Sequence, residues 1–124
     1  MARLGTSLDQ CQQFYGQTDL LYKKSENLVI AGWENKNGCN IVCELIGGVV
    51  HSVFIQSVRG HLSPEQLKYS THINAQDEKN YPIGQISDFS AVQVLGPNRV
   101  IYFDIDPNLS YIKIYTSEFK KITE

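Results

Sequence analysis

Glu44 and His51 are the two side chains of this sequence that could act together in general acid–base chemistry. A carboxylate that orients an imidazole is a common arrangement for moving protons. The Gly-Gly dipeptide between them is a preferred two-residue hairpin turn, and a hairpin in that register places Glu44 opposite His51. Such a cross-strand pair also stabilises an ordinary sheet. Because Cys43 and Ser52 are expected on the opposite face, no nucleophile joins the pair, and we assign no catalytic residue.

Motifs for metal or cofactor binding are absent from the sequence. The three histidines, His51, His61 and His72, do not fall in a ligand spacing such as H-x-x-x-H. Asp104 and Asp106 begin like a calcium loop, but the central glycine and the terminal glutamate of such a loop are missing. The glycine-rich phosphate-binding motifs are missing as well. We therefore predict no metal site and no cofactor.

The three cysteines, Cys11, Cys39 and Cys43, are predicted to be small buried thiols. Cys39 and Cys43 are four residues apart on a predicted strand, which separates them by about 13 Å. A disulfide needs Cα atoms within about 7 Å, so these two cannot bond to each other. Cys43 is expected opposite Gly32, which indicates close approach of the helix that carries Cys11. A Cys11–Cys43 or Cys11–Cys39 disulfide is the alternative to free thiols.

Capping and turn signals predict two short helices and a series of strands. Thr6 or Ser7 can cap a first helix that ends at Gly16, and Ser63-Pro64 begins a second one. Strands are predicted over residues 20–24, 28–34, 39–46, 49–58, 86–95, 100–105 and 111–115, with a terminal turn over 117–122. The economical topology is an antiparallel meander of six to seven strands, with the two helices packed on one face.

The length of 124 residues is that of one domain, and we predict a single α+β domain over residues 1–124. Hydrophobic residues make up 42% of the chain and charged residues 19%, which excludes intrinsic disorder. The net charge of −2 and the lack of a basic stripe argue against nucleic acid as a partner. No apolar run is long enough to span a membrane, and no internal repeat is visible.

Tight turns fix the register of neighbouring strands and therefore the face on which each side chain lies. The Asn37-Gly38 turn pairs Trp33 with Val42, and this register divides the apolar residues between two faces. The expected helix-covered face carries Leu28, Ile30, Cys39, Ile41, Cys43, Leu45, Val50 and Phe54. The other face is also apolar, so it is either covered by later strands or forms an interface. Its candidate binding residues are Trp33, Val42, Glu44, His51 and Val53.

The segment from Leu4 to Gly16, with its Gly-Thr-Ser start and Phe-Tyr-Gly end, resembles the first helix of small exported bacterial domains. These are the SmpA/OmlA outer-membrane lipoproteins and the β-lactamase-inhibitor-like fold. The hairpin from Cys39 to Val58 is similar to the segment that follows there, although Gln17-Thr18 stands where such motifs commonly carry proline. The resemblance covers about the first half of the chain. It implies an exported α+β domain whose sheet binds another protein without catalysis.

These observations favour a non-catalytic domain that uses an apolar sheet face to bind a protein partner or a second copy of itself as a homodimer. Two alternatives remain open. One is a small ligand carrier with a pocket between the helices and the sheet, and the other is a hydrolase-like enzyme centred on Glu44 and His51. The N-terminal residues lack the apolar core of a signal peptide, so we expect a cytoplasmic protein or a periplasmic one whose export signal was removed.

Overall fold

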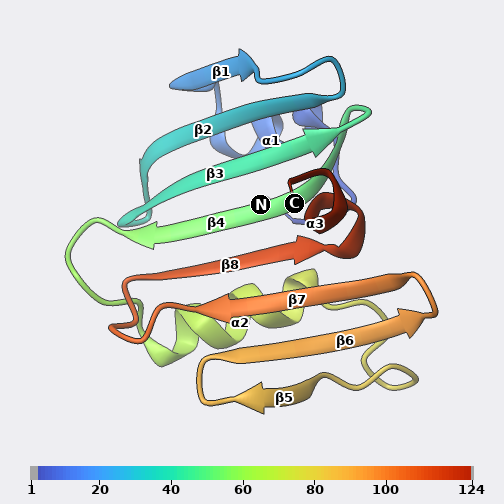
Figure 1. The fold of residues 1–124 in the computed structure, drawn as a ribbon. Coiled ribbons are helices and arrows are strands. Elements are labelled where there is room, and N and C mark those ends of the chain that lie inside the picture. The colour runs from blue at the N-terminus through green and yellow to red at the C-terminus, as the bar shows by residue number, and fades with distance from the viewer. Residues whose placement is uncertain (1–2, 124) are drawn as a thin grey trace.

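One eight-stranded antiparallel sheet with three helices forms the part of the chain that the structure describes (Figure 1). The structure is a computed structural model and describes residues 3–123. The helices are α1 (Leu8–Tyr15), α2 (Pro64–Asn74) and α3 (Ser117–Thr123), and the strands are β1 (Leu20–Lys23), β2 (Leu28–Lys36), β3 (Cys39–Ile46), β4 (Val49–Ser57), β5 (Gly84–Ser87), β6 (Ser90–Gly96), β7 (Arg99–Ile105) and β8 (Tyr111–Thr116). The α+β class and the antiparallel sheet are confirmed. A turn at residues 88–89 divides one predicted strand into β5 and β6, and the predicted terminal turn is α3.

Two halves of the chain repeat the same arrangement, a helix followed by a four-stranded meander. The strand order is β1-β2-β3-β4-β8-β7-β6-β5, so the strands of each half follow one another in chain order from an edge to the centre of the sheet. Figure 1 shows α1 behind the first half and α2 behind the second. Cys43 pairs with Val53 in the first half and Phe103 with Ile114 in the second, while Val53 and Ile114 pair at the centre. The sheet therefore has an approximate two-fold axis at this pair. The sequence hides the repeat because equivalent positions carry different residues.

Both α1 and α2 begin with the same reciprocal cap. The Ser7 hydroxyl accepts from the backbone N–H of Gln10, and the Gln10 side chain accepts from the backbone N–H of Ser7. Ser63 and Gln66 make the same pair of bonds at the start of α2. These caps satisfy N–H groups that the first turn of a helix leaves unpaired. The shared pattern of serine, any residue, an acid and glutamine is a trace of the repeat in the sequence.

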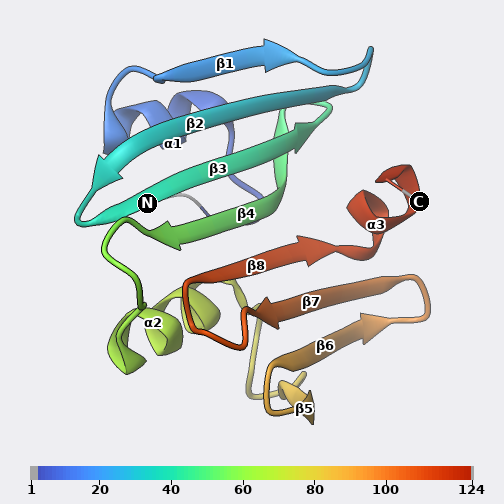
Figure 2. The ribbon, with the colours of Figure 1, turned by 60° about the vertical axis from the view of Figure 1, so that its left-hand side comes forward.

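The helices lie on different faces of the sheet. α1 and α2 cover one face, whereas α3 lies at one end of the opposite face (Figures 1 and 2). Phe119 of α3 is buried, and its ring meets the ring of Tyr115 edge-on with centroids 6.1 Å apart. The larger part of the second face is therefore left without a covering helix in the described chain.

A bulge in β2 changes the predicted register of the first hairpin. The turn itself is as predicted, because Lys36 pairs with Cys39 across it. β2 carries one extra residue just before the turn, and Asn35 there adopts a φ of 49° in the left-handed region. Trp33 consequently pairs with Ile41, one position away from the partner that the tight turn alone predicts. A shift of one residue turns each side chain onto the other face, so Trp33 points toward the helices.

A second bulge lies in β4, after the Gly-Gly turn. Leu45 pairs with Val50, as the turn predicts. The next pair, however, is Glu44 with Ser52, which makes His51 the extra residue of the bulge. The predicted opposition of Glu44 and His51 is therefore wrong.

The two bulges exchange the faces of several residues. Trp33 and Val53, which were expected on the second face, are buried under the helices with 1% and 0% exposure. Leu28, Ile30 and Phe54, which were expected beneath the helices, lie instead on the opposite face. The prediction of apolar side chains on both faces nevertheless holds, with a different set of residues on each.

Equivalent residues of β2 and β6 fasten the loop that follows each helix. The Trp33 indole N–H donates to the carbonyl of Gly16, at 3.0 Å. The fully buried Gln93 occupies the matching place in the second half, and its amide N–H groups donate to the carbonyls of Gln76 and Tyr81. These side chains satisfy loop carbonyls that would otherwise be buried without a partner.

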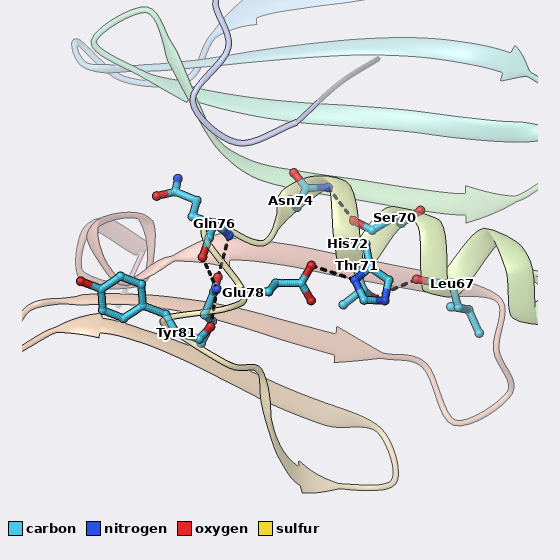
Figure 3. Close-up of polar contacts among 9 residues, drawn as sticks. Leu67, Ser70, Thr71, His72, Asn74, Gln76, Glu78 and Tyr81 are labelled. Carbon is cyan, nitrogen blue, oxygen red and sulfur yellow. Dashed lines mark hydrogen bonds and ion pairs between the residues drawn. The ribbon is translucent and has the colours of Figure 1, made fainter.

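The end of α2 is held by buried and surface contacts. Asn74, 2% exposed, accepts from the backbone N–H of Leu4 at 2.8 Å. Its side-chain amide also donates to the carbonyl of Ser70 (Figure 3). His72 Nδ1 lies 2.9 Å from Glu78 Oε2, which joins the helix to the loop beyond it (Figure 3). The bond to Leu4 links the start of the first half to the helix of the second.

We expect Trp33→Ala to lower the free energy of unfolding by about 3–5 kcal/mol, because it leaves a cavity beneath α1. Urea denaturation followed by circular dichroism measures this loss. Phe14→Ala is the matched control, since Phe14 on α1 is 56% exposed and its loss should change stability by no more than about 0.5 kcal/mol. Equal, small losses for both variants would contradict the burial of Trp33.

Candidate functional site

The face of the sheet opposite α1 and α2 is the candidate functional site, and we call it the open face. Its side chains come from alternate positions of the strands, as the pairing of β2, β3, β4, β8 and β7 dictates. Its apolar members are Leu28, Ile30, Val42, Phe54, Tyr102, Tyr111 and Tyr115, and its charged members are Glu44, Lys113 and Asp104. The site thus joins both halves of the repeat.

Four aromatic rings form two pairs across the middle of the open face. Phe54 of β4 packs against Tyr111 of β8, with ring centroids 4.9 Å apart. Tyr102 of β7 and Tyr115 of β8 are paired residues whose rings stack at 5.1 Å with an interplanar angle of 19°. All four are only partly buried. Rings in such arrangements are rigid and present apolar area without much loss of side-chain freedom on binding.

Charged groups lie beside these rings and fix their orientation. The Tyr115 hydroxyl donates to Asp104 Oδ2 at 2.7 Å. Burial, together with this bond to an anion, raises the pKa of Tyr115 well above its ordinary value. The Lys113 ammonium lies 5.0 Å from the centre of the Phe119 ring, and the Lys120 ammonium lies 4.7 Å from the centre of the Tyr102 ring.

Two of the five predicted binding residues lie on the open face. Val42 lies on β3 beside Phe54, and Glu44 accepts a hydrogen bond from the Ser52 hydroxyl at 3.2 Å. Trp33 and Val53 are on the other face, buried beneath the helices, and cannot contact a partner there. The β-bulges separate these residues, which a regular hairpin would have brought together.

His51, the fifth predicted residue, lies next to α3. Its Nδ1 is 2.9 Å from the Thr116 hydroxyl oxygen, and its Nε2 is 4.0 Å from Glu118 Oε2. The imidazole borders a cavity of about 180 Å³ at the end of the sheet. Ser117 also lines this cavity, but its hydroxyl donates to the carbonyl of Asn98 and accepts from a backbone N–H. The histidine therefore joins β4 to the start of α3 through Thr116 and Glu118.

A second cavity, of about 240 Å³, lies between α1, α2 and the sheet. Ile41 and Ile55 line it from the strands, Tyr15 and Tyr69 from the two helices, and Cys39 completes the apolar part. Burial raises the pKa of the Cys39 thiol, so this sulfur is protonated and unreactive at neutral pH. The cavity lies between the helices and the sheet, where a ligand pocket was one of the alternatives left open by the sequence.

Within residues 3–123, no cluster of three or more histidine, cysteine, aspartate or glutamate side chains could hold a metal ion. In the same residues, no helix is both long enough and apolar enough to cross a bilayer.

The sequence analysis did not include Tyr102, Asp104 and Tyr115 among the candidate binding residues. These residues belong to the second half of the chain and lie on the open face. The alternation of polar and apolar residues in 111–115 was visible and predicted a strand. It also indicates that Tyr115 shares a face with Lys113 and Tyr111. The sequence does not show that β8 pairs with β4, because strands more than 50 residues apart leave no local signal of their pairing.

Comparisons with known proteins bear on the fold. No family model matches the sequence, and no curated protein matches it. Among solved structures, the fold is similar to a cysteine-rich secretory protein from Staphylococcus aureus subsp. aureus Mu50, with a TM-score of 0.52 and 11% identity. The likeness covers 94% of this chain and 45% of that protein, so this chain spans less than half of its length. At this identity the comparison shows the fold alone.

We expect Tyr115→Phe to lower stability by about 1–2 kcal/mol at neutral pH, because the bond to Asp104 is lost. The raised pKa of Tyr115 means that the native protein keeps this proton where the unfolded chain has released it. Stability should therefore fall as the pH rises above about 10, and fall less steeply in Tyr115→Phe. Thermal unfolding across alkaline pH measures both effects. Tyr69→Phe, at a 53% exposed tyrosine, should behave like the parent protein, and a similar change in both variants would contradict the assignment.

Proposed function

We propose that this domain is a non-catalytic protein-binding module that associates with a second copy of itself through the open face. The observation that carries the proposal is the band of partly exposed rings across β4, β8 and β7, Phe54 with Tyr111 and Tyr102 with Tyr115. Tyrosines are enriched among the residues that dominate binding energy at interfaces. The resemblance of the first half to exported domains with a protein-binding sheet favours the same role.

The balance of positive and negative charges on the open face supports a second copy of the chain as its binding partner. Glu44 and Asp104 on the open face are offset by Lys113 on the face and by Lys120 beside it. A surface with both signs of charge does not repel a copy of itself, whereas a face of one sign would. The approximate two-fold axis also passes through this face, so the two halves offer similar positions to a symmetric partner.

Sedimentation equilibrium from micromolar to millimolar concentration tests the proposal. The parent protein should form a dimer, and Phe54→Glu should weaken the dimer at least about thirtyfold, because a charge would replace a ring at the centre of the interface. Tyr22→Lys provides a second disruptive variant at a 47% exposed position of β1, opposite Ile30, where folding is not at risk.

Phe14→Glu is the matched control for these variants, since it introduces the same charge at an exposed aromatic residue on the helix side of the sheet. It should leave the dimer unchanged. A parent protein that stays monomeric over the whole range would overturn the proposal. So would a dimer that survives both open-face variants, provided that circular dichroism shows each variant to be folded.

The cavity between α1 and α2 favours a second candidate function, the binding of a small apolar molecule. Its volume of about 240 Å³ lies just below the range that is usual for ligand sites, and its lining is mostly apolar. Anilinonaphthalene sulfonate is a suitable fluorescent probe. Its emission should rise with the parent protein and fall with Tyr69→Ala at the cavity, but not with Tyr81→Ala away from it. Equal binding to both variants would reject this site.

A further inference from the structure

The packing of α1 brings two cysteines, Cys11 and Cys43, together in one buried cluster. Cys11 and Tyr15 are one helical turn apart and are the buried side chains of α1. Tyr15 lies on Trp33, with ring centroids 5.3 Å apart, which places the preceding turn of the helix above the next inward-facing positions of the sheet. Cys43 of β3 occupies such a position, in the same buried cluster as Cys11, and its thiol is the main influence on the pKa of Cys11.

The surroundings of the two thiols allow this close approach. Cys43 pairs with Ala31 of β2, whose small side chain leaves room for the helix. Cys11 and Cys43 are 1% and 0% exposed. The sequence predicted close approach of the Cys11 helix at Cys43, and the structure confirms it, with Ala31 rather than Gly32 as the opposite residue.

The third cysteine is not part of this pair. Cys39 is four residues from Cys43 along β3 and lies under α2, where its sulfur accepts a long hydrogen bond from Gln66 Nε2 at 3.7 Å. Four residues of a strand span about 13 Å, which is too far for a disulfide. Cys39 is therefore a built-in control for the chemistry of the other two.

The two thiols of the pair differ in their tendency to ionise. The Thr6 hydroxyl lies 3.5 Å from the Cys11 sulfur. The Cys43 thiol is the main cause that lowers the pKa of Cys11, to about 6. Burial opposes this change, and the Thr6 hydroxyl lowers the pKa further. The pKa of Cys43 is raised, first by the Cys11 thiol and then by burial. Cys11 is thus the thiol of the pair that ionises more readily to the thiolate, the form that reacts with peroxides, and Cys43 is the thiol that can resolve the product.

We propose that Cys11 and Cys43 form a reversible disulfide on reaction with hydrogen peroxide, which ties α1 covalently to β3. The Cys11 thiolate attacks one peroxide oxygen, the O–O bond breaks, and the departing hydroxide takes up a proton and leaves as water. The Cys43 sulfur then attacks the sulfenic sulfur of Cys11, the S–O bond breaks, and the proton of Cys43 leaves with the hydroxide as a second water. Two electrons pass from the sulfurs to the peroxide oxygens.

A small oxidant has a short path to Cys11. The segment before α1 and the helix itself border a surface hollow of about 320 Å³, lined by Arg3, Thr6 and Gln10 among others. Thr6 lies between this hollow and the Cys11 sulfur, which its hydroxyl contacts. Peroxide is close to water in size and needs only a small displacement of this segment. A larger disulfide reagent would be excluded by the same burial.

The closed disulfide should change stability in a measurable way. Joining residues 11 and 43 closes a loop of more than 30 residues, and cross-links of that span restrict the unfolded chain. For a domain of this size, we expect the midpoint of thermal unfolding to rise by about 10 °C after oxidation and to return after treatment with dithiothreitol.

The experiment treats the reduced protein with hydrogen peroxide and measures its intact mass, its peptide map and its thermal midpoint. The expected result is the loss of two hydrogens, a Cys11–Cys43 cross-linked peptide and the higher midpoint. Cys39→Ser should give the same result. Cys43→Ser should instead leave a sulfenic acid at Cys11 that dimedone labels, because the resolving thiol is missing.

Two outcomes would overturn the inference. One is a folded parent protein whose Cys11 and Cys43 remain reduced under peroxide that oxidises Cys39. The other is a cross-link that includes Cys39 or that joins two chains. Both outcomes are measured on the parent protein, so the proposal can be tested even if a cysteine variant fails to fold.

Discussion

The pairing of β4 with β8 is the constraint on which the rest of the structure depends. It joins two meanders, each of which would otherwise end in an unpaired edge, into one continuous sheet. Because Val53 and Ile114 meet at its centre with both side chains directed under the helices, the neighbouring Phe54 and Lys113 are directed to the open face. The helix-covered core and the ring pairs of the open face are therefore two results of the same register.

The local parts of the fold could be predicted because their signals are local. The serine caps of α1 and α2 and the hairpin turns at residues 37–38 and 47–48 lie where the sequence indicated them. The bulges at Asn35 and His51 could not be read, since neither position carries the glycine that commonly marks a bulge. Each bulge adds one residue, and one residue is enough to turn a predicted interface residue such as Trp33 into a core residue.

The candidate site was predicted only in part for the same reason. Val42 and Glu44 were assigned to the correct surface, because they lie on β3, the strand common to both hairpins. The rings of Tyr102 and Tyr115 were missed, since their place beside Phe54 follows from the long-range pairing of β8. A sequence can show which side chains alternate along a strand, whereas tertiary contacts decide which strand lies next to it.

The bond between Leu4 and Asn74 has a consequence for how the molecule unfolds. The backbone of residues 4–6 is hydrogen-bonded to Val50 in the first half and, through Leu4, to the buried side chain of Asn74 in the second. Repeat architectures often lose their units one at a time. Here the opening of either half breaks the bond between Leu4 and Asn74, so we expect the two halves to unfold together rather than one after the other.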